Sequence, residues 1–272
     1  MNDVQKKAFE MLRIFIDICE KWNIKYYLLC GSALGAVKYQ GFIPWDDDID
    51  VGLLRKDYRR FLEVAPKELP EWCFLQNYST DPANPFASTK LRNSNTTFLQ
   101  ISVAHLPINH GIFIDVFPLD GYPQGCGARM LFELRKKILL WKCFCSLSGP
   151  EDPKVRFRNK VFRILGYHRR TPRTLEKLEN LYSQYPPEES DLWCNYCNSA
   201  DKQEYAPRWH YGEGAWATFE GLRVRIPERY DAYLTQKYGD WRSDLPEEKK
   251  CSQHLCVVCD AQTPFTEYTQ KQ

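Results

Sequence analysis

The sequence lacks several features that would assign a protein to a class at once. No run of its 272 residues approaches the ~20 apolar residues that a membrane-spanning helix needs, and Met1–Glu10 carries no charged-then-apolar leader. We therefore expect no spanning helix and no secretory signal, and a cytoplasmic location, at most at the inner face of a membrane. The net charge of only +2 gives no general attraction to nucleic acid.

Cysteine, by contrast, is abundant. The chain has 11 cysteines, an odd number, and most stand among hydrophobic residues. In the absence of a leader we interpret them as reduced thiols and not as a disulfide framework. Cys194–Cys197 and Cys256–Cys259 have the spacing of zinc ligands within each pair, but the second pair also fits a buried strand. Zinc is therefore the less favoured interpretation.

Carboxylates are concentrated at one place, in the stretch Trp45–Asp50. Aspartates occupy positions 46, 47, 48 and 50, and apolar residues stand on both sides. On an extended strand from 47 to 54, Asp48 and Asp50 point to the same face. Neighbouring carboxylates repel each other unless a cation lies between them, and hard oxygen ligands suit Mg²⁺ or Mn²⁺. A solvated acidic turn is the alternative, which the apolar flanks do not favour.

The residues before this stretch predict an anion site. The apolar run 26–30 has the length of a strand and ends at Gly31-Ser32, and a short helix is expected over 33–39. Glycine lets a phosphate approach the main chain, and the Ser32 hydroxyl together with the first amides of the helix can hold an anion. A strand ending in Gly-Ser is usually only a turn, but here an Asp-x-Asp follows at short distance.

Two further stretches supply candidate charges. The run 112–117 is the most hydrophobic strand of the chain and has Asp115 at its centre, which is costly unless that carboxylate binds a metal or a buried arginine. Asp120, after Pro118, is expected to be a turn residue. Lys90 and Arg92, two apart on a strand, share a face and can clamp a diphosphate; a solvated strand edge is the alternative.

The remaining pattern predicts mainly helices and one hairpin. Apolar residues at steps of three and four indicate an amphipathic helix over 4–22, and 216–227 alternates around a glycine turn as a hairpin does. The run 154–170 is basic and interleaved with apolar residues. Such a helix can lie on an anionic membrane surface, but a solvated helix face is the commoner case and is the interpretation that we favour.

These motifs together resemble a known family. Gly31-Ser32 followed by Asp48-Ile49-Asp50-Val51 resembles the signature of the nucleotidyltransferase superfamily. The longer string 34–50 resembles the LicD family of phosphocholine transferases, to which fukutin and fukutin-related protein are related. The resemblance continues at 90–96, 111–121 and 238–241, so it spans most of the chain, with a poorly matching middle.

The resemblance implies a fold and a domain organisation. The expected class is α+β, with the mixed sheet of a polymerase β-like nucleotidyltransferase flanked by helices and a mostly helical elaboration. Residues 1–123 would form the catalytic core, 124–200 the mostly helical insertion, and 201–272 a C-terminal segment that returns to the core.

It also implies an activity and a set of site residues. The family moves phosphocholine, or a related alditol phosphate, from a CDP-activated donor to a sugar hydroxyl of a cell-surface glycan or lipid-linked glycan such as lipopolysaccharide or teichoic acid. The implied catalytic and metal-binding residues are Asp48, Asp50 and Asp115. One of these aspartates would also deprotonate the acceptor hydroxyl; the sequence does not say which, and Asp115 is the one that we choose. The implied substrate-binding residues are Gly31, Ser32, Trp45, Asp46, Lys90, Arg92 and His254. Candidates for an aromatic cage around choline are Tyr26, Tyr27, Trp45, Tyr78, Trp209 and Trp216, without individual assignment.

Two other functions stay open at this point. One is a true nucleotidyltransferase that moves NMP from an NTP to a sugar, tRNA or protein. The other is a catalytically inactive binding module, which the intact Gly-Ser and acidic positions do not favour. Donor, acceptor and oligomeric state do not follow from the sequence.

Overall fold

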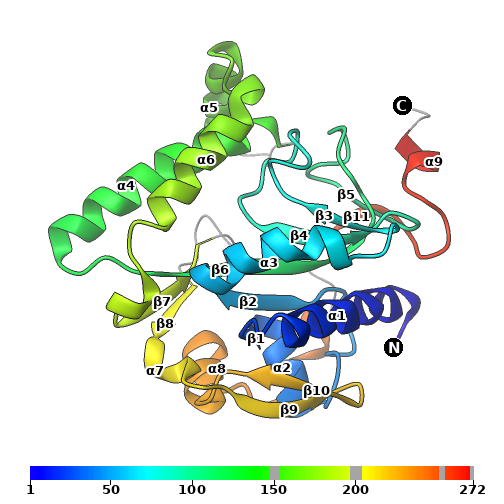
Figure 1. The fold of residues 1–272 in the computed structure, drawn as a ribbon. Coiled ribbons are helices and arrows are strands. Elements are labelled where there is room, and N and C mark those ends of the chain that lie inside the picture. The colour runs from blue at the N-terminus through cyan, green and yellow to red at the C-terminus, as the bar shows by residue number, and fades with distance from the viewer. Residues whose placement is uncertain (148–152, 197–203, 251–254, 270–272) are drawn as a thin grey trace.

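A computed structural model describes residues 1–147, 153–196, 204–250 and 255–269 of the chain. Helices and a mixed sheet alternate along the sequence, so the predicted α+β class is confirmed. In Figure 1 the sheet runs through the middle of the molecule, with helices in front of it and a separate group of helices at one end. Within the described ranges, no helix is long and apolar enough to cross a membrane.

The central sheet has the strand order β1–β2–β6–β4–β3, and β7 and β8 extend it from the end of β6. The pairs β1–β2, β6–β4 and β4–β3 are antiparallel, whereas β2 and β6 run parallel. β6 is buried along its whole length, which explains its nearly continuous apolar sequence. The bounds are β1 Tyr26–Leu28, β2 Asp50–Leu54, β3 Cys73–Gln76, β4 Thr89–Asn93, β6 Ile112–Gly121, β7 Leu192–Asn195 and β8 Glu204–Pro207.

Two helices cover one face of this sheet (Figure 1): α1 (Asp3–Lys21) and α3 (Arg55–Glu68). α1 confirms the helix expected over 4–22, and it begins with a capping box in which Asn2 and Gln5 bond each other's backbone amides. Phe15 of α1 packs against Phe61 of α3 with 5.1 Å between ring centroids.

The C-terminal part packs around β1 and α2 (Cys30–Lys38). The hairpin predicted over 216–227 is confirmed as β9 (Ala215–Phe219) and β10 (Leu222–Ile226), and its buried side chains belong to the main core. The neighbouring short helices are α7 (Arg208–Tyr211) and α8 (Tyr230–Tyr238). Further along, η4 (Glu247–Lys249) comes before β11 (Cys256–Asp260), which pairs with β5 (Thr97–Gln100). The short helix α9 (Thr266–Thr269) follows β11.

A second hydrophobic cluster lies between the helices that follow β6, around Phe132, Leu178 and Tyr182. The elements there are α4 (Cys126–Cys143), η1 (Phe144–Ser146), α5 (Pro153–Ile164), η2 (Tyr167–Arg170), α6 (Thr171–Tyr182) and η3 (Pro187–Glu189). The expectation that 124–200 is mostly helical overlooked β7, which pairs with Asp120 and Gly121 at the end of β6. The boundaries at 123/124 and 200/201 stay a prediction.

Candidate functional site

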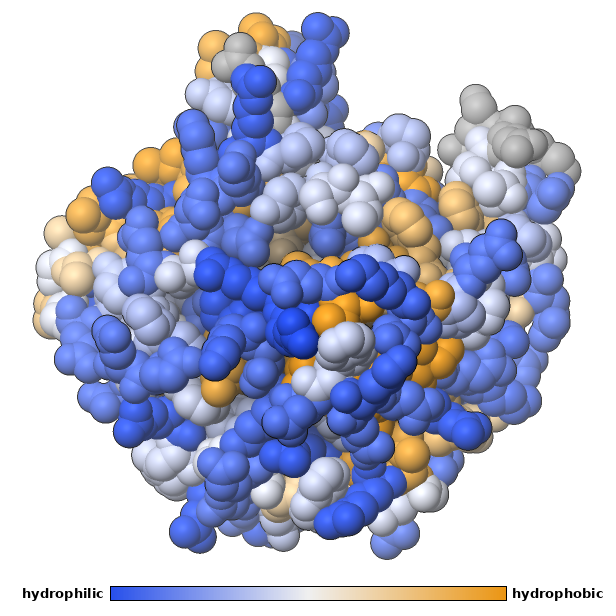
Figure 2. All heavy atoms as spheres, viewed as in Figure 1, coloured by the Kyte–Doolittle hydropathy of each residue, from blue (hydrophilic) through white to orange (hydrophobic). Residues whose placement is uncertain are grey.

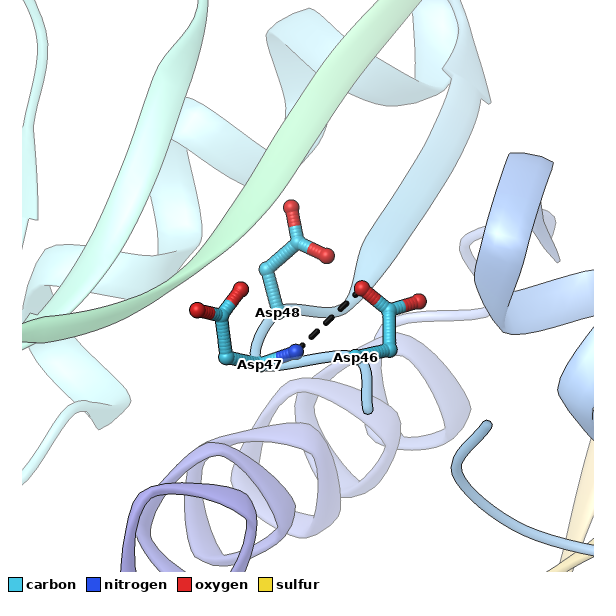
Figure 3. Close-up of side chains that lie close together, drawn as sticks. All are labelled: Asp46, Asp47 and Asp48. Atoms are coloured by element: carbon cyan, nitrogen blue, oxygen red, sulfur yellow. Dashed lines mark hydrogen bonds between the residues drawn. The ribbon is translucent and has the colours of Figure 1, made fainter. Parts of the chain in front are cut away.

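The acidic stretch forms the loop between α2 and β2. β2 begins at Asp50, later than predicted, and Asp46, Asp47 and Asp48 lie in the turn before it. Figure 3 shows their three carboxylates rising from one bend of the chain, with the Asp47 amide donating to Asp46 Oδ1 at 3.2 Å. One ligand oxygen of each lies within 4.8 Å of the others.

A second acidic group joins this loop to the sheet. Asp50 of β2 stands directly beside Asp115 of β6 in the parallel register, and one carboxylate oxygen each of Asp48, Asp50 and Asp115 lie within 4.8 Å of one another. Asp48 and Asp50 are partly exposed, whereas Asp115 is buried. The structure therefore brings together the three aspartates to which the sequence pointed.

Lys90 of β4 lies next to Asp115, on the strand that follows β6 in the sheet. It is the register partner of Asp115 in the β4–β6 pair, and its Nζ contacts Asp115 Oδ2 at 2.6 Å. Its Nζ also lies 3.5 Å from the ring centroid of Phe113. Burial lowers the pKa of Lys90, although Asp115 favours its charged form. Lys90 was expected to bind a phosphate, but in this structure it is the counter-charge of Asp115.

The carboxylate oxygens of Asp48, Asp50 and Asp115 suit a hard divalent cation. Three carboxylates offer only oxygen ligands, and Lys90 balances one of their three charges. Two partly exposed carboxylates next to a buried one repel each other unless a cation lies between them. Asp48, Asp50 and Asp115 therefore fit Mg²⁺ or Mn²⁺ better than they fit a softer metal.

The first turn of α2 borders the acidic loop. The helix begins at Cys30, so Gly31 and Ser32 lie inside its first turn and not before it, and among the described residues no side chain caps that turn. Ser32 Oγ accepts the Asp50 amide at 2.8 Å, which ties α2 to the start of β2. A Cβ built on Gly31 would lie 2.6 Å from Asp46 Oδ2. The Asp46 carboxylate thus lies against the positively polarised end of the helix.

Two polar side chains that sequence reasoning missed hold the loop in place. Gln5 of α1 is buried, and its Nε2 donates to the Asp46 carbonyl at 2.8 Å. Glu220, in the turn of the β9–β10 hairpin, accepts the Phe42 amide at 3.1 Å. A glutamine at the third position of an amphipathic helix, on its apolar face, was the available signal for Gln5. Glu220 lies 178 residues from Phe42, and no local pattern indicates such a contact.

Arg92 occupies a different environment from the one predicted. Its side chain is 1% exposed, with Nε donating to Gln76 Oε1 at 2.5 Å and a terminal nitrogen donating to the Gly111 carbonyl at 2.6 Å. Burial lowers the pKa of Arg92 to about 10. A phosphate clamp needs an accessible guanidinium, so this placement favours a role in holding β3, β4 and the start of β6 together.

Asp120 is not the turn residue that the sequence suggested. It lies within β6, is 1% exposed and binds Arg55 through two oxygens at 2.7 and 2.5 Å. Arg55 also contacts Glu179 of α6 at 3.0 Å. Asp115 and Asp120 are five residues apart on one strand, so they face opposite sides of the sheet. The buried pairing with arginine that was weighed for Asp115 is found at Asp120.

The other predicted substrate residues are less defined. Trp45 is half-buried, contacts Tyr39 edge-to-face and has Lys250 Nζ 5.5 Å from its ring centroid. Tyr26 and Tyr27 are buried in the core, so neither is available for an aromatic cage. His254 lies outside the described residues.

In the described part of the chain, no cysteine belongs to a group of three close metal ligands. The nine cysteines in those ranges form no disulfide with one another, and both groups of three close ligands consist of aspartates. Cys194 is buried on β7 and Cys256 lies on β11, in a different sheet. Cys197 lies outside the described residues. The zinc interpretation of the Cys194–Cys197 pair thus stays a prediction.

An α+β chain with carboxylates gathered at one end of two parallel strands, beside the first turn of a helix, matches one class of protein. Residues 23–128 match the family model described as LicD/FKTN/FKRP, nucleotidyltransferase domain. This segment contains Gly31, Ser32 and the aspartates at 48, 50 and 115. The match bears out, over this segment, the resemblance to the LicD family seen in the sequence motifs.

Individual relatives extend the match beyond that segment. The lipopolysaccharide cholinephosphotransferase LicD of Haemophilus influenzae is 25% identical over 267 residues, which covers 94% of this chain and 96% of the relative. An uncharacterised protein of Rickettsia prowazekii is 32% identical over 154 residues, 54% of this chain and 52% of its own length. The human ribitol 5-phosphate transferase FKRP is 38% identical over 48 residues, 18% of this chain and 10% of the relative.

Proposed function

We propose that this chain is a metal-dependent transferase that moves phosphocholine, or a related alditol phosphate, from a CDP-activated donor to a sugar hydroxyl of a glycan. The observation that carries the proposal is the meeting of Asp48, Asp50 and Asp115 across β2 and β6. The relatives named for cholinephosphate and ribitol 5-phosphate transfer support it. The nucleotidyltransferase-like fold and peripheral association with a membrane belong to the same proposal.

Each group of the site has a role in this reaction. The first turn of α2 would receive a donor phosphate, because glycine at 31 lets the phosphate approach the backbone amides. Asp48, Asp50 and Asp115 would hold Mg²⁺ or Mn²⁺. When bound, the ion would neutralise charge that develops at phosphorus. Ser32, through its bond to the Asp50 amide, positions that carboxylate.

The acceptor hydroxyl must lose a proton during the transfer. Asp115 is buried and one of its oxygens already contacts the Lys90 ammonium, so it is poorly placed to reach an acceptor hydroxyl as the base. Asp48 and Asp50 are partly exposed, and each has a carboxylate oxygen within 4.8 Å of one of Asp115. We therefore move the proposed base from Asp115 to one of these two residues.

The donor chemistry can be tested directly. Purified protein is incubated with Mg²⁺, a sugar acceptor and either CDP-choline, CDP-ribitol or CDP-glycerol. We expect release of CMP together with labelling of the acceptor by the phosphocholine or alditol phosphate. Labelling of the acceptor by NMP from an NTP, with no CMP release from any CDP donor, would establish the nucleotidyltransferase alternative instead.

Two glycines of α2 provide a matched pair of substitutions. In Gly31→Ala the new methyl meets the end of the Asp46 side chain, which can rotate away, whereas in Gly35→Ala it meets the Gly41 carbonyl at 2.4 Å. We expect Gly35→Ala to lose roughly 1–3 kcal/mol of stability in chemical denaturation. Gly31→Ala should keep its stability and raise the KM for the CDP donor. Equal stability losses in both variants would contradict the assigned role of Gly31.

A further inference from the structure

An apolar stripe on α4 is left uncovered. Met130 is 74% exposed, and Leu131, Leu134 and Ile138 also project to solvent. Positions 130, 134 and 138 recur every four residues, so they lie one above the other on a single face of the helix. The face that packs on the second cluster carries other residues, among them Phe132 and Leu140. The stripe is therefore a second apolar face, which is not buried in the part of the chain that the structure describes.

α5 repeats the pattern. Phe157 is 70% exposed and Ile164 is 75% exposed, and Val161 and Leu165 are exposed beside them. Their spacing of three, four and eight residues again places them on one side of the helix. In Figure 2 hydrophobic side chains gather at the outer edge over α4 and at the tip formed by α5, with hydrophilic side chains between the two groups. Solvent-exposed patches of this kind mark interaction surfaces.

The exposed charge on these two helices is mainly basic; Glu133 of α4, the one acidic residue within α4 and α5, is paired with Lys136. α5 carries Lys154, Arg156, Arg158, Lys160 and Arg163 and no acidic residue. Arg135 and Lys137 are exposed on α4, next to its apolar stripe. The two helices are connected at Trp141 of α4, whose ring lies 5.2 Å from Lys137 Nζ and 5.1 Å from the Arg158 guanidinium carbon. Apolar and basic groups thus occur on both helices at one end of the molecule (Figure 1).

We infer that this α4–α5 surface docks on an anionic phospholipid bilayer, with α5 lying in the plane of the interface. Apolar side chains would enter the boundary between headgroups and acyl chains, and the flanking lysines and arginines would contact the lipid phosphates. A second copy of the chain fits less well, because a two-fold contact would place two basic faces against each other. The inference deepens the peripheral membrane association that is part of the proposed function, but the binding itself needs neither donor nor metal.

The experiment measures co-sedimentation of the full chain with vesicles. Vesicles of phosphatidylcholine with about 30 mol% phosphatidylglycerol are compared with vesicles of phosphatidylcholine alone. We expect binding to the anionic vesicles that weakens when ionic strength rises from about 0.1 to about 0.5 M. A double variant, Phe157→Gln with Ile164→Gln, should have a vesicle affinity that is lower than that of the wild type by a factor of roughly ten or more. Arg156→Gln with Lys160→Gln should weaken binding by a similar factor.

A matched control uses apolar residues exposed elsewhere. Leu255 is 74% exposed and Val257 is 60% exposed, both at β11, so Leu255→Gln with Val257→Gln should leave vesicle binding unchanged. Equal binding by wild type and all three double variants, or no binding to anionic vesicles, would overturn the inference. Self-association that the Phe157/Ile164 variant abolishes would assign the surface to a second copy instead. CMP release from a CDP donor with a water-soluble acceptor, measured in parallel, reports on the proposed function separately.

Discussion

Asp48→Asn is expected to lower transferase activity at least a thousandfold, which corresponds to about 4 kcal/mol of transition-state stabilisation. The physical reason is that Asp48 contributes one of three carboxylates to the proposed metal site, and an amide is a weaker ligand for Mg²⁺. Stability without metal should be unchanged or slightly higher, because a like charge beside Asp50 has been removed. Steady-state kinetics and thermal unfolding of the same preparation check both statements.

Metal-dependent stabilisation gives a second measurement on the same variant. For the wild type, Mg²⁺ at about a hundred times its Kd should contribute roughly 2.7 kcal/mol to the free energy of unfolding, and Asp48→Asn should lose most of it. Asp47→Asn is the matched control. Asp47 lies close to Asp46 and Asp48 in the loop, but it is not one of the three carboxylates that meet at Asp115. We expect it to change activity less than tenfold. If Asp47→Asn were as damaging as Asp48→Asn, the loop carboxylates alone would form the site.

Asp115→Asn should behave differently from Asp48→Asn. It also removes a metal ligand, but it leaves the buried Lys90 ammonium without its partner. Breaking a buried ion pair from one side costs several kcal/mol, so this variant should lose stability as well as activity. The comparison separates ligands that only serve the reaction from the ligand that also supports the sheet.

Asp120→Ala is expected to lower the stability of the chain by about 3–5 kcal/mol, with a fall in Tm of roughly 10 °C. The substitution leaves the Arg55 guanidinium, which is 5% exposed, without the two carboxylate oxygens that now accept its hydrogen bonds. Arg55 then keeps only the partly exposed Glu179 as its counter-charge, so a buried charge that is only partly compensated is the cause of the expected loss. Chemical denaturation monitored by tryptophan fluorescence measures it.

Two control variants make this result specific. Replacing both partners, Arg55→Leu with Asp120→Leu, should recover a large part of the lost stability, because both buried charges are then gone, and Glu179, which loses Arg55, is partly exposed and still accepts a hydrogen bond from Tyr78. Lys6→Ala, which removes an ion pair that is largely exposed on both sides, should cost at most about 0.5 kcal/mol. If the double variant were as unstable as Asp120→Ala, packing and not charge would explain the loss.

Local sequence patterns predicted those parts of the fold that depend on periodicity and turn chemistry. The stripe of α1, the glycine turn of the β9–β10 hairpin and the apolar run of β6 each follow from side chains within a few residues of one another. The boundaries of β2 and α2 were less accurate. β2 begins only where Asp50 pairs with Asp115, and α2 already includes Gly31 and Ser32. Both boundaries are set by tertiary contacts, which local sequence patterns do not show.

The candidate site could be predicted as a set of residues but not as a network. Acidic density indicated Asp48 and Asp50, and a charge within a hydrophobic strand indicated Asp115. The same argument placed Asp115 inside the apolar run and Asp120 in a turn after it, and it could not show that the strand continues through Asp120 or which of the two carboxylates pairs with an arginine. Their faces differ, and only the position of Arg55 on α3 shows which carboxylate is paired inside the core. The contacts of Lys90 and Arg92 likewise depend on the register of β4 against β3 and β6.

A crystal of the protein soaked with Mn²⁺ and examined by anomalous diffraction tests the central claim most directly. We expect one anomalous peak at coordination distance, about 2.0–2.2 Å, from carboxylate oxygens of Asp48, Asp50 and Asp115 together. A peak bound only by the loop residues Asp46 and Asp47, or no peak at saturating Mn²⁺ with a CDP donor present, would contradict the account.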